Sequence, residues 1–285
     1  MKPAIFDYVR PGSLDEVLAE LAQDPDESKI LAGGQSLVPM MNFRLARPER
    51  LIDINTVPGL EGVEERDGRV VIRTRTRHLA LQNLAMATPL GALLRQGAAN
   101  VGHLPIRTRG TFGGSIAHCD AASEWCLIAS LLDAEMTVVS QARGERTIPA
   151  SDFFLSIFTT AMETDEVLTS ISLPALGEGY VTGIAEFARR AGDFAIVAAT
   201  GAVKVVDGVV EEARVCLGGV ADTPFRSAAA EQTLLGQAWT PELLAGAAEA
   251  AADEVNPPSD AHGDSEYRRD LVRALLPRAL DTVGR

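Results

Sequence analysis

The chain has 285 residues, of which 46% are hydrophobic and 23% charged, so it holds enough apolar material for about two domains with buried cores. Its 26 basic and 39 acidic residues give a net charge of −13, and such an acidic surface repels nucleic-acid phosphates and anionic lipid head groups. The charged N-terminus shows no secretory signal and no apolar run approaches the roughly 20 residues that cross a bilayer, so we expect a cytoplasmic protein that binds no nucleic acid and has no membrane span.

The first part of the chain, about residues 1–57, alternates short strands with helices. Ser13 and Glu16 form a capping box, in which the Ser13 hydroxyl accepts an early helix N–H and Glu16 reaches back. Apolar residues then follow at helical spacing. The order strand, helix, strand, helix, strand predicts a small unit with its elements at Ile5–Val9, Ser13–Leu21, Lys29–Ala32, Leu37–Leu45 and Leu51–Ile54.

The second part, about residues 58–176, begins with a hairpin around the turn dipeptide Asp67-Gly68. Thr88 precedes a helix with Pro89 in its first turn, where proline is well tolerated. Turn-forming residues at 174–179 then indicate a domain boundary near residue 176. The elements expected here are strands at 62–66, 69–74, 136–140 and 166–173, helices at 88–97 and 124–132, and a glycine-rich loop at 109–117.

Residues 177–285 are predicted to form a smaller C-terminal domain. Three stretches of alternating apolar and polar residues, two of them joined by the turn Asp207-Gly208, predict an antiparallel sheet. The fold class is therefore α+β, with a two-part α/β domain over residues 1–176 followed by a sheet with three helices. The strands are expected at 182–189, 198–206 and 209–217, and the helices at 226–235, 241–255 and 264–283.

The first candidate site is Ala32-Gly33-Gly34-Gln35-Ser36, between a predicted strand and a predicted helix. Paired glycines permit positive φ, so successive backbone N–H groups can point at one anion, and the positive end of the next helix adds to them. This geometry suits a phosphate or pyrophosphate. The spacing matches neither the three-glycine dinucleotide motif nor a phosphate loop ending in Gly-Lys-Ser/Thr. Taken alone, the segment could equally be an ordinary turn.

A second paired-glycine segment, Arg109–Ser115, follows about 80 residues later. Because a pyrophosphate carries two phosphates, two such segments could converge on it, although spacing alone leaves open that they are unrelated turns. No Ser/His/Asp arrangement and no pair of acids indicates catalysis by side chains. We expect His78 and His103 to be surface or loop residues.

The three cysteines, Cys119, Cys126 and Cys216, are too few for an Fe–S cluster, which usually takes four thiolates. They form no C-x-x-C pair, so a zinc site is not expected either. An odd, sparse set also argues against a disulfide framework. The sequence therefore predicts no metal site on this chain, and any cluster in a working assembly must lie on another chain.

Four segments together resemble the FAD-binding subunits of the xanthine dehydrogenase and carbon monoxide dehydrogenase family of molybdenum hydroxylases. Their order and spacing, and the length of the chain, agree with that family from end to end. The segments are Ala32–Met41 with Leu51–Ile54, Thr108–Trp125, Arg189–Ala195 and Glu266–Arg269.

The resemblance implies a PCMH-type FAD-binding domain and non-covalent FAD. It places Glu124, where the family usually has Asp, near the ribityl and ribose hydroxyls, and Leu168 against the adenine. The loop around Asp193 would approach the isoalloxazine ring, and no residue is implied to be catalytic. The residues implied to bind FAD are Lys29, Leu31, Ala32, Gly33, Gly34, Gln35, Ser36, Leu37, Val101, Thr111, Gly113, Gly114, Ser115, Asp120, Glu124, Leu168, Arg189, Asp193 and Phe194.

The same resemblance implies an oxidoreductase subunit that transfers electrons. A molybdenum cofactor on a large partner and Fe–S clusters on a small partner would feed this FAD, which passes electrons to an external acceptor, in a dimer of heterotrimers. One alternative is a self-sufficient flavin oxidase or dehydrogenase of the vanillyl-alcohol oxidase type, although the short C-terminal domain leaves little room for a substrate pocket. Another is a nucleotide-binding module without catalysis.

Overall fold

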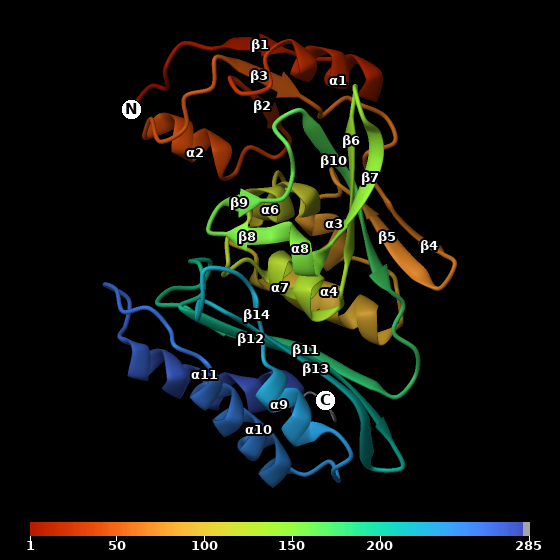
Figure 1. Cartoon of the computed structure of the whole chain (residues 1–285), viewed down its shortest axis with the longest axis vertical. Coiled ribbons are helices and arrows are strands. Elements are labelled where there is room, and N and C mark those ends of the chain that lie inside the picture. Colours follow the sequence, from red (N-terminus) through yellow and green to blue (C-terminus); the bar gives the residue numbers. More distant parts are fainter. Residues whose placement is uncertain (282–285) are drawn as a thin grey trace.

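The computed structural model describes residues 1–281 and arranges them around three larger β-sheets that follow one another along the long axis, with a fourth sheet of two short strands (Figure 1). Parallel strands need crossover connections, and in the first sheet helices α1 (Leu14–Gln23) and α2 (Leu37–Asn42) supply them. This first sheet has the order β1 (Asp7–Val9), β3 (Arg50–Asp53), β2 (Ser28–Leu31), with both pairs parallel.

Helix α1 begins where its sequence predicts. The N–H of Glu16 donates to Ser13 Oγ over 3.2 Å, but the Glu16 carboxylate accepts from the N–H of Gly12, over 2.6 Å, instead of from Ser13. Two backbone N–H groups are still satisfied, as in a capping box, but the Glu16 carboxylate bonds to Gly12, one residue before Ser13.

The second sheet is antiparallel and mixes segments from distant parts of the chain. Its first hairpin turns at Asp67 and Gly68, whose φ angles of 52° and 73° are the paired positive values of a tight two-residue turn. The strand order is β4 (Val63–Arg66), β5 (Arg69–Arg73), β10 (Glu166–Pro174), β6 (Glu135–Ser140), β7 (Gly144–Pro149).

A layer of helices lies between the second and third sheets and carries the main apolar core (Figure 1). Trp125, Phe112 and Phe153 are its largest fully buried side chains. The elements of this layer are α3 (His78–Gln82), α4 (Pro89–Asn100), α5 (Leu104–Arg107), α6 (Phe112–His118), α7 (Glu124–Leu131), α8 (Ala150–Phe153) and the small hairpin of β8 (Phe154–Ser156) and β9 (Thr159–Thr160).

Both faces of the third sheet are covered. Ala198 and Cys216 face the helical layer and join its core, whereas Ala199 and Leu217, their neighbours along the strands, join the core beneath the C-terminal helices. The sheet is antiparallel, in the order β11 (Tyr180–Phe187), β12 (Val197–Val206), β13 (Val209–Gly218), β14 (Phe225–Arg226), and its outer helices are α9 (Ala228–Leu234), α10 (Pro241–Glu254) and α11 (Ser265–Leu280).

The structure confirms the α+β class and most predicted elements, and it corrects several bounds. Residues 109–117 are not a loop throughout, because Thr111 accepts the N–H of Gly114 over 3.1 Å and starts helix α6. The helix predicted to reach residue 45 ends at Asn42, and Arg226 belongs to β14 instead of a helix. Positions 282–283 of the last predicted helix lie outside the described residues. Elements α3, α5, β7, α8, β8 and β9 were not predicted from the sequence.

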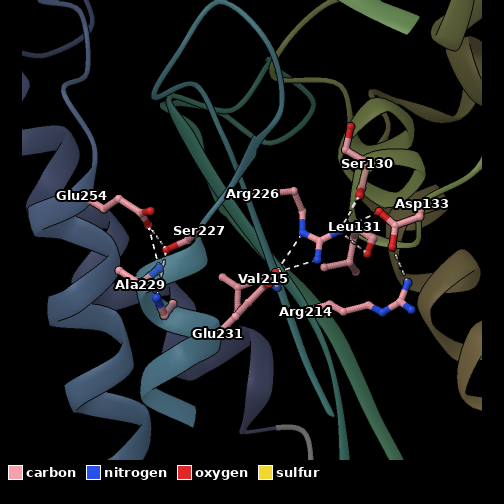
Figure 2. A network of polar contacts seen from close by, with 11 residues as sticks. Ser130, Leu131, Asp133, Arg214, Val215, Arg226, Ser227, Ala229, Glu231 and Glu254 are labelled. Atoms are coloured by element: carbon pink, nitrogen blue, oxygen red, sulfur yellow. Dashed lines mark hydrogen bonds and ion pairs between the residues drawn. The ribbon is translucent and has the colours of Figure 1, made fainter. Parts of the chain in front are cut away.

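A polar network joins the third sheet to the end of α7 (Figure 2). The Arg226 guanidinium donates to the carbonyl oxygens of Ser130 and Leu131, at 3.0 and 3.1 Å. It also contacts Asp133 at 3.1 Å and Glu231 at 2.7 Å. Since the last carbonyls of a helix lack partners within it, Arg226 caps α7 from another layer of the molecule.

We predict that Arg226→Ala lowers the free energy of unfolding by about 2 kcal/mol, because it leaves several acceptors at the interface without a charged donor. Arg226→Lys should recover only part of the loss, since an ammonium group cannot reach carbonyls and carboxylates in the same planar arrangement. Chemical denaturation measures the difference. Arg66→Ala, which removes an exposed ion pair to Asp67, is the control and should leave the transition unchanged.

Candidate functional site

The two paired-glycine segments meet in the fold. A Cβ atom placed on Gly33 would lie 2.7 Å from the Gly110 Cα and would clash with the Arg109 carbonyl group. The two backbones therefore touch where no side chain larger than hydrogen fits. Segments that are about 80 residues apart in the sequence form one continuous surface.

A polar bridge beside this contact fixes the two segments to each other. Asn55 Nδ2 donates to the carbonyl oxygen of Ala32 over 2.8 Å, and Arg77 donates to Asn55 Oδ1 over 2.5 Å. Arg77 also donates to the Arg109 carbonyl. Asp53 in turn accepts from the N–H of Asn55 over 2.8 Å. The bridge therefore runs from the end of the first segment to the start of the second.

The first segment, residues 32–36, keeps its backbone donors free. Gly34 has φ of 68°, and of the four paired glycines it alone is in the left-handed region. Within residues 1–281, the N–H groups of residues 33–36 donate to no protein acceptor. Gln35 donates its side-chain amide to the Gly33 carbonyl over 3.0 Å, which holds the turn. Four unpaired N–H groups in succession can bind an anionic oxygen.

The second segment, residues 109–115, uses its donors differently from the sequence interpretation. The N–H groups of Phe112 and Gly113 each donate to a backbone carbonyl over 2.9 Å, and that of Gly114 donates to Thr111. A Cβ on Gly113 would lie 2.7 Å from the Thr74 Cα. The glycines here permit close packing against β5 and the turn that follows, instead of positive φ.

His78 contacts the second segment at Gly110, and its predicted surface location is wrong because the residue exposes only 4% of its surface. Trp125 Nε1 donates to His78 Nδ1 over 3.0 Å, which leaves Nε2 protonated on the neutral ring. A Cβ on Gly110 would lie 2.6 Å from that Nε2. Burial, reinforced by Arg77 and Arg107, lowers the pKa of His78 to about 4.

Glu124 is the first residue of α7 and exposes 9% of its surface. Burial raises its pKa to about 8, with further contributions from the negative charges of Glu186 and Asp120. The Ser115 and Ser123 hydroxyl oxygens lie 2.8 Å apart, so the second glycine segment is joined to the start of α7. A buried acid thus lies next to the surface that the glycine segments form.

The loop at residues 188–195 reaches this region from the third sheet. A Cβ on Gly192 would lie 2.7 Å from the His103 ring nitrogens, so the loop packs against the N-terminus of α5. Phe194 is 64% exposed. Arg189 donates to the Ala261 carbonyl over 2.6 Å, and the buried Arg268 donates to the Ile196 carbonyl over 2.6 Å. These two arginines fix both ends of the loop.

The structure brings together most, but not all, of the residues that the sequence singled out. The two glycine segments adjoin each other. Glu124 lies on α7, which packs against α6, and the loop around Asp193 packs against His103 at the N-terminus of α5. Lys29 is exposed on β2. Leu168 exposes only 4% of its surface and packs into the core of the second sheet. Asn55 and Arg77, which bridge the two glycine segments, were not predicted to belong to the site. In the sequence each is only a polar residue that follows a strand or a turn.

Among the described residues, metal ligands, membrane-spanning helices and reactive cysteines are the other features that could indicate a function. Within residues 1–281, no group of three or more His, Cys, Asp and Glu side chains is placed to hold a metal ion. In the same residues no helix is long and apolar enough to span a bilayer. Cys119, Cys126 and Cys216 are all buried as free thiols, and burial raises the pKa of each.

Comparisons with known proteins agree along the whole chain. Residues 4–176 match the family "FAD binding domain in molybdopterin dehydrogenase", and residues 184–283 match "CO dehydrogenase flavoprotein C-terminal domain". Among curated proteins, the alpha subunit of the 6-hydroxypseudooxynicotine dehydrogenase complex of Paenarthrobacter nicotinovorans is 38% identical, over 98% of this chain and 95% of that protein. The nicotine 6-hydroxylase medium subunit of the same organism is 36% identical, over 100% and 99%.

A solved structure shows the same fold. A chain of carbon monoxide dehydrogenase from Hydrogenophaga pseudoflava superimposes with a TM-score of 0.93 at 36% identity, covering 99% of this chain and 98% of that one.

We predict that Gly33→Ala and Gly34→Val each abolish most FAD binding. In the first variant the new Cβ pushes the two segments apart, and in the second it strains a left-handed residue, at a cost of about 1–3 kcal/mol each. The ratio of flavin to protein absorbance in purified material measures the loss. Gly177→Ala is the control, because no atom lies within 4 Å of its Cβ position and it should bind FAD normally. Full flavin content in both site variants would show that these glycines only form turns.

We also predict that His78 contributes a loss of stability as the pH falls from about 6.5 toward 4, which the raised pKa values of Glu124 and Glu186 oppose. His78 has a folded-state pKa of about 4, below the ordinary value of 6.5, so the unfolded chain binds the additional proton over this interval. The effect is on the order of 3 kcal/mol. His78→Gln should be less stable than wild type at neutral pH but should lack this component of the acid loss. His262→Gln, at an exposed position, should follow the wild-type curve.

Proposed function

The chain belongs to the FAD-binding subunits of the xanthine dehydrogenase and carbon monoxide dehydrogenase family, and from this premise we propose that it passes electrons from the Fe–S clusters of a partner subunit, through FAD, to an external acceptor. It is an oxidoreductase subunit with an FAD-binding domain. The observation that carries the proposal is the contact of the two glycine segments, since it creates a single binding surface from two distant parts of the chain.

The residues at this surface fit FAD. The free N–H groups of residues 33–36 suit one phosphate of the pyrophosphate. We propose that the buried Glu124 faces hydroxyl groups of the cofactor and that the exposed Phe194 lies toward its ring system. Since none of these groups is a ready nucleophile toward a flavin, we propose that FAD is held without a covalent bond.

When bound, the flavin ring would accept and pass on the electrons, while this chain holds it, excludes water from part of it and sets its surroundings. We propose that residues 1–176 form the FAD-binding domain, with parts at about 1–57 and 58–176. Residues 177–281, with the remaining residues up to 285 outside the described structure, would form a C-terminal domain. The third sheet would contribute the loop at 188–195 to the binding surface.

Relatives of this chain carry names with different substrates, among them nicotine, caffeine and carbon monoxide, at 31–36% identity. We infer that the substrate is selected elsewhere, on a large molybdenum-containing partner, and that a small Fe–S partner lies between the two. The names "medium subunit" and "medium chain" among the relatives support such an assembly. We further propose that two heterotrimers pair by two-fold symmetry.

The first prediction from this proposal concerns the cofactor. Protein purified from its native source should be yellow, with FAD that acid precipitation releases completely into the supernatant. Flavin that stays with the precipitated chain would overturn non-covalent binding, and protein without any flavin would overturn the proposed function.

A second prediction concerns the assembly. The native complex should contain iron and molybdenum, whereas this chain expressed alone should contain neither, because within residues 1–281 it has no suitable ligand cluster. The isolated chain should turn over no substrate of the complex, although artificial dyes should still exchange electrons with its flavin. Native material that purifies as this polypeptide alone, free of both metals and fully active, would favour a self-sufficient oxidase.

A further inference from the structure

One row of residues crosses the third sheet and points toward the start of α7. Glu186 on β11 pairs with Ala198 on β12, which pairs with Gly218 on β13. Directly opposed residues of an antiparallel sheet project from the same face. Ala198 belongs to the core of the helical layer, and a Cβ on Gly218 would lie 3.1 Å from the Ala121 carbonyl and 2.9 Å from Leu127. The side chain of Glu186 therefore projects toward the segment that contains Glu124.

Among residues 1–281, neither carboxyl group bonds to the side chain or backbone of another residue. Glu124 is nine-tenths buried, and within residues 1–281 its carboxylate bonds to no other residue. Glu186 has one buried carboxyl oxygen, Oε2, without any hydrogen-bond partner. No ion pair of the described residues involves either side chain, and the charged groups that act on Glu124 are the acids Glu186 and Asp120. A buried acid and a half-buried acid thus lie close enough to repel each other.

Ionising both carboxyl groups of this pair at once is energetically unfavourable. Burial penalises the charged form of each acid, and a second negative charge nearby adds repulsion. Burial raises the pKa of Glu186 to about 7, and burial together with Glu186 raises that of Glu124 to about 8. At neutral pH the pair therefore holds at least one proton, and the two acids titrate together.

We propose that Glu124 and Glu186 together bind the hydroxyl groups of the flavin's sugar-alcohol chain and share a proton there, so that FAD binds most tightly when the pair is protonated. This rests on the proposed function, which puts FAD at this surface. One protonated and one ionised carboxyl can both donate to and accept from hydroxyl groups, which suits a polyol. Glu186 comes from the third sheet and Glu124 from the helical layer, so the flavin would join the two.

The pair also makes binding depend on pH in a defined direction. FAD carries two negative charges on its pyrophosphate, so it adds to the repulsion that an ionised pair must bear. FAD should therefore bind with uptake of protons above about pH 7, and its affinity should fall as the pH rises.

The test measures the Kd of FAD for the full-length apoprotein by quenching of flavin fluorescence at a series of pH values. We expect the wild-type Kd to rise about tenfold or more between pH 6.5 and pH 9. Glu186→Gln should reduce that rise, and the double variant Glu124→Gln with Glu186→Gln should change less than about threefold, because an amide cannot ionise. Glu178→Gln, at an exposed position just before β11, is the matched control and should keep the wild-type profile.

A second measurement counts protons directly. Calorimetric titration of the apoprotein with FAD at pH 8, in two buffers of different ionisation enthalpy, should show uptake of about one proton by wild type and close to none by the double variant. Both amide substitutions remove a buried charge, so the variants should fold, and circular dichroism checks this.

The outcomes separate the two proposals. An unchanged pH profile in the double variant, or in Glu186→Gln, overturns the shared-proton pair while FAD binding itself stands. A wild-type chain that binds FAD equally well at every pH also overturns the shared-proton pair and leaves FAD binding intact. A wild-type chain that binds no FAD at any pH overturns the proposed function.

Discussion

The contact between Gly33 and residues 109–110 is the constraint on which the candidate site depends. It joins the loop that ends a strand of the first sheet to the segment that starts α6, and it leaves no space for a Cβ atom. Asn55 and Arg77 hold the two backbones in place by hydrogen bonds to their carbonyl groups. Within residues 1–281 the N–H groups of residues 33–36 donate to no protein acceptor, so they remain available to bind an anion.

The glycines around that contact have different structural roles. Gly34 supplies a left-handed residue that turns the first segment, with φ of 68°. Gly110 and Gly113 have ordinary φ and instead let the second segment lie against His78 and Thr74. The same sequence pattern thus serves conformational freedom at one position and close packing at others.

Helix α7 connects the candidate site to the third sheet. Its first residue is the buried Glu124, and its last carbonyls accept hydrogen bonds from Arg226 of the third sheet (Figure 2). The third sheet therefore holds α7 from both ends, through Arg226 at one and through the row containing Glu186 at the other. Small residues such as Ala198 and Gly218 permit the close approach, since larger side chains on that face would separate the layers.

The sequence by itself determined the α+β class, the hairpins at Asp67-Gly68 and Asp207-Gly208, and the family, because turn chemistry, apolar periodicity and ordered motifs are local properties of the chain. Only the tertiary structure decided that residues 109–117 contain a helix, that His78 is buried, and that the two glycine segments touch. The approach of Glu186 on β11 to Glu124 on α7 likewise depends on a strand and a helix that are about 60 residues apart in the sequence. Burial and contact arise from how distant segments pack, and no local pattern encodes which of its neighbours a polar side chain will meet.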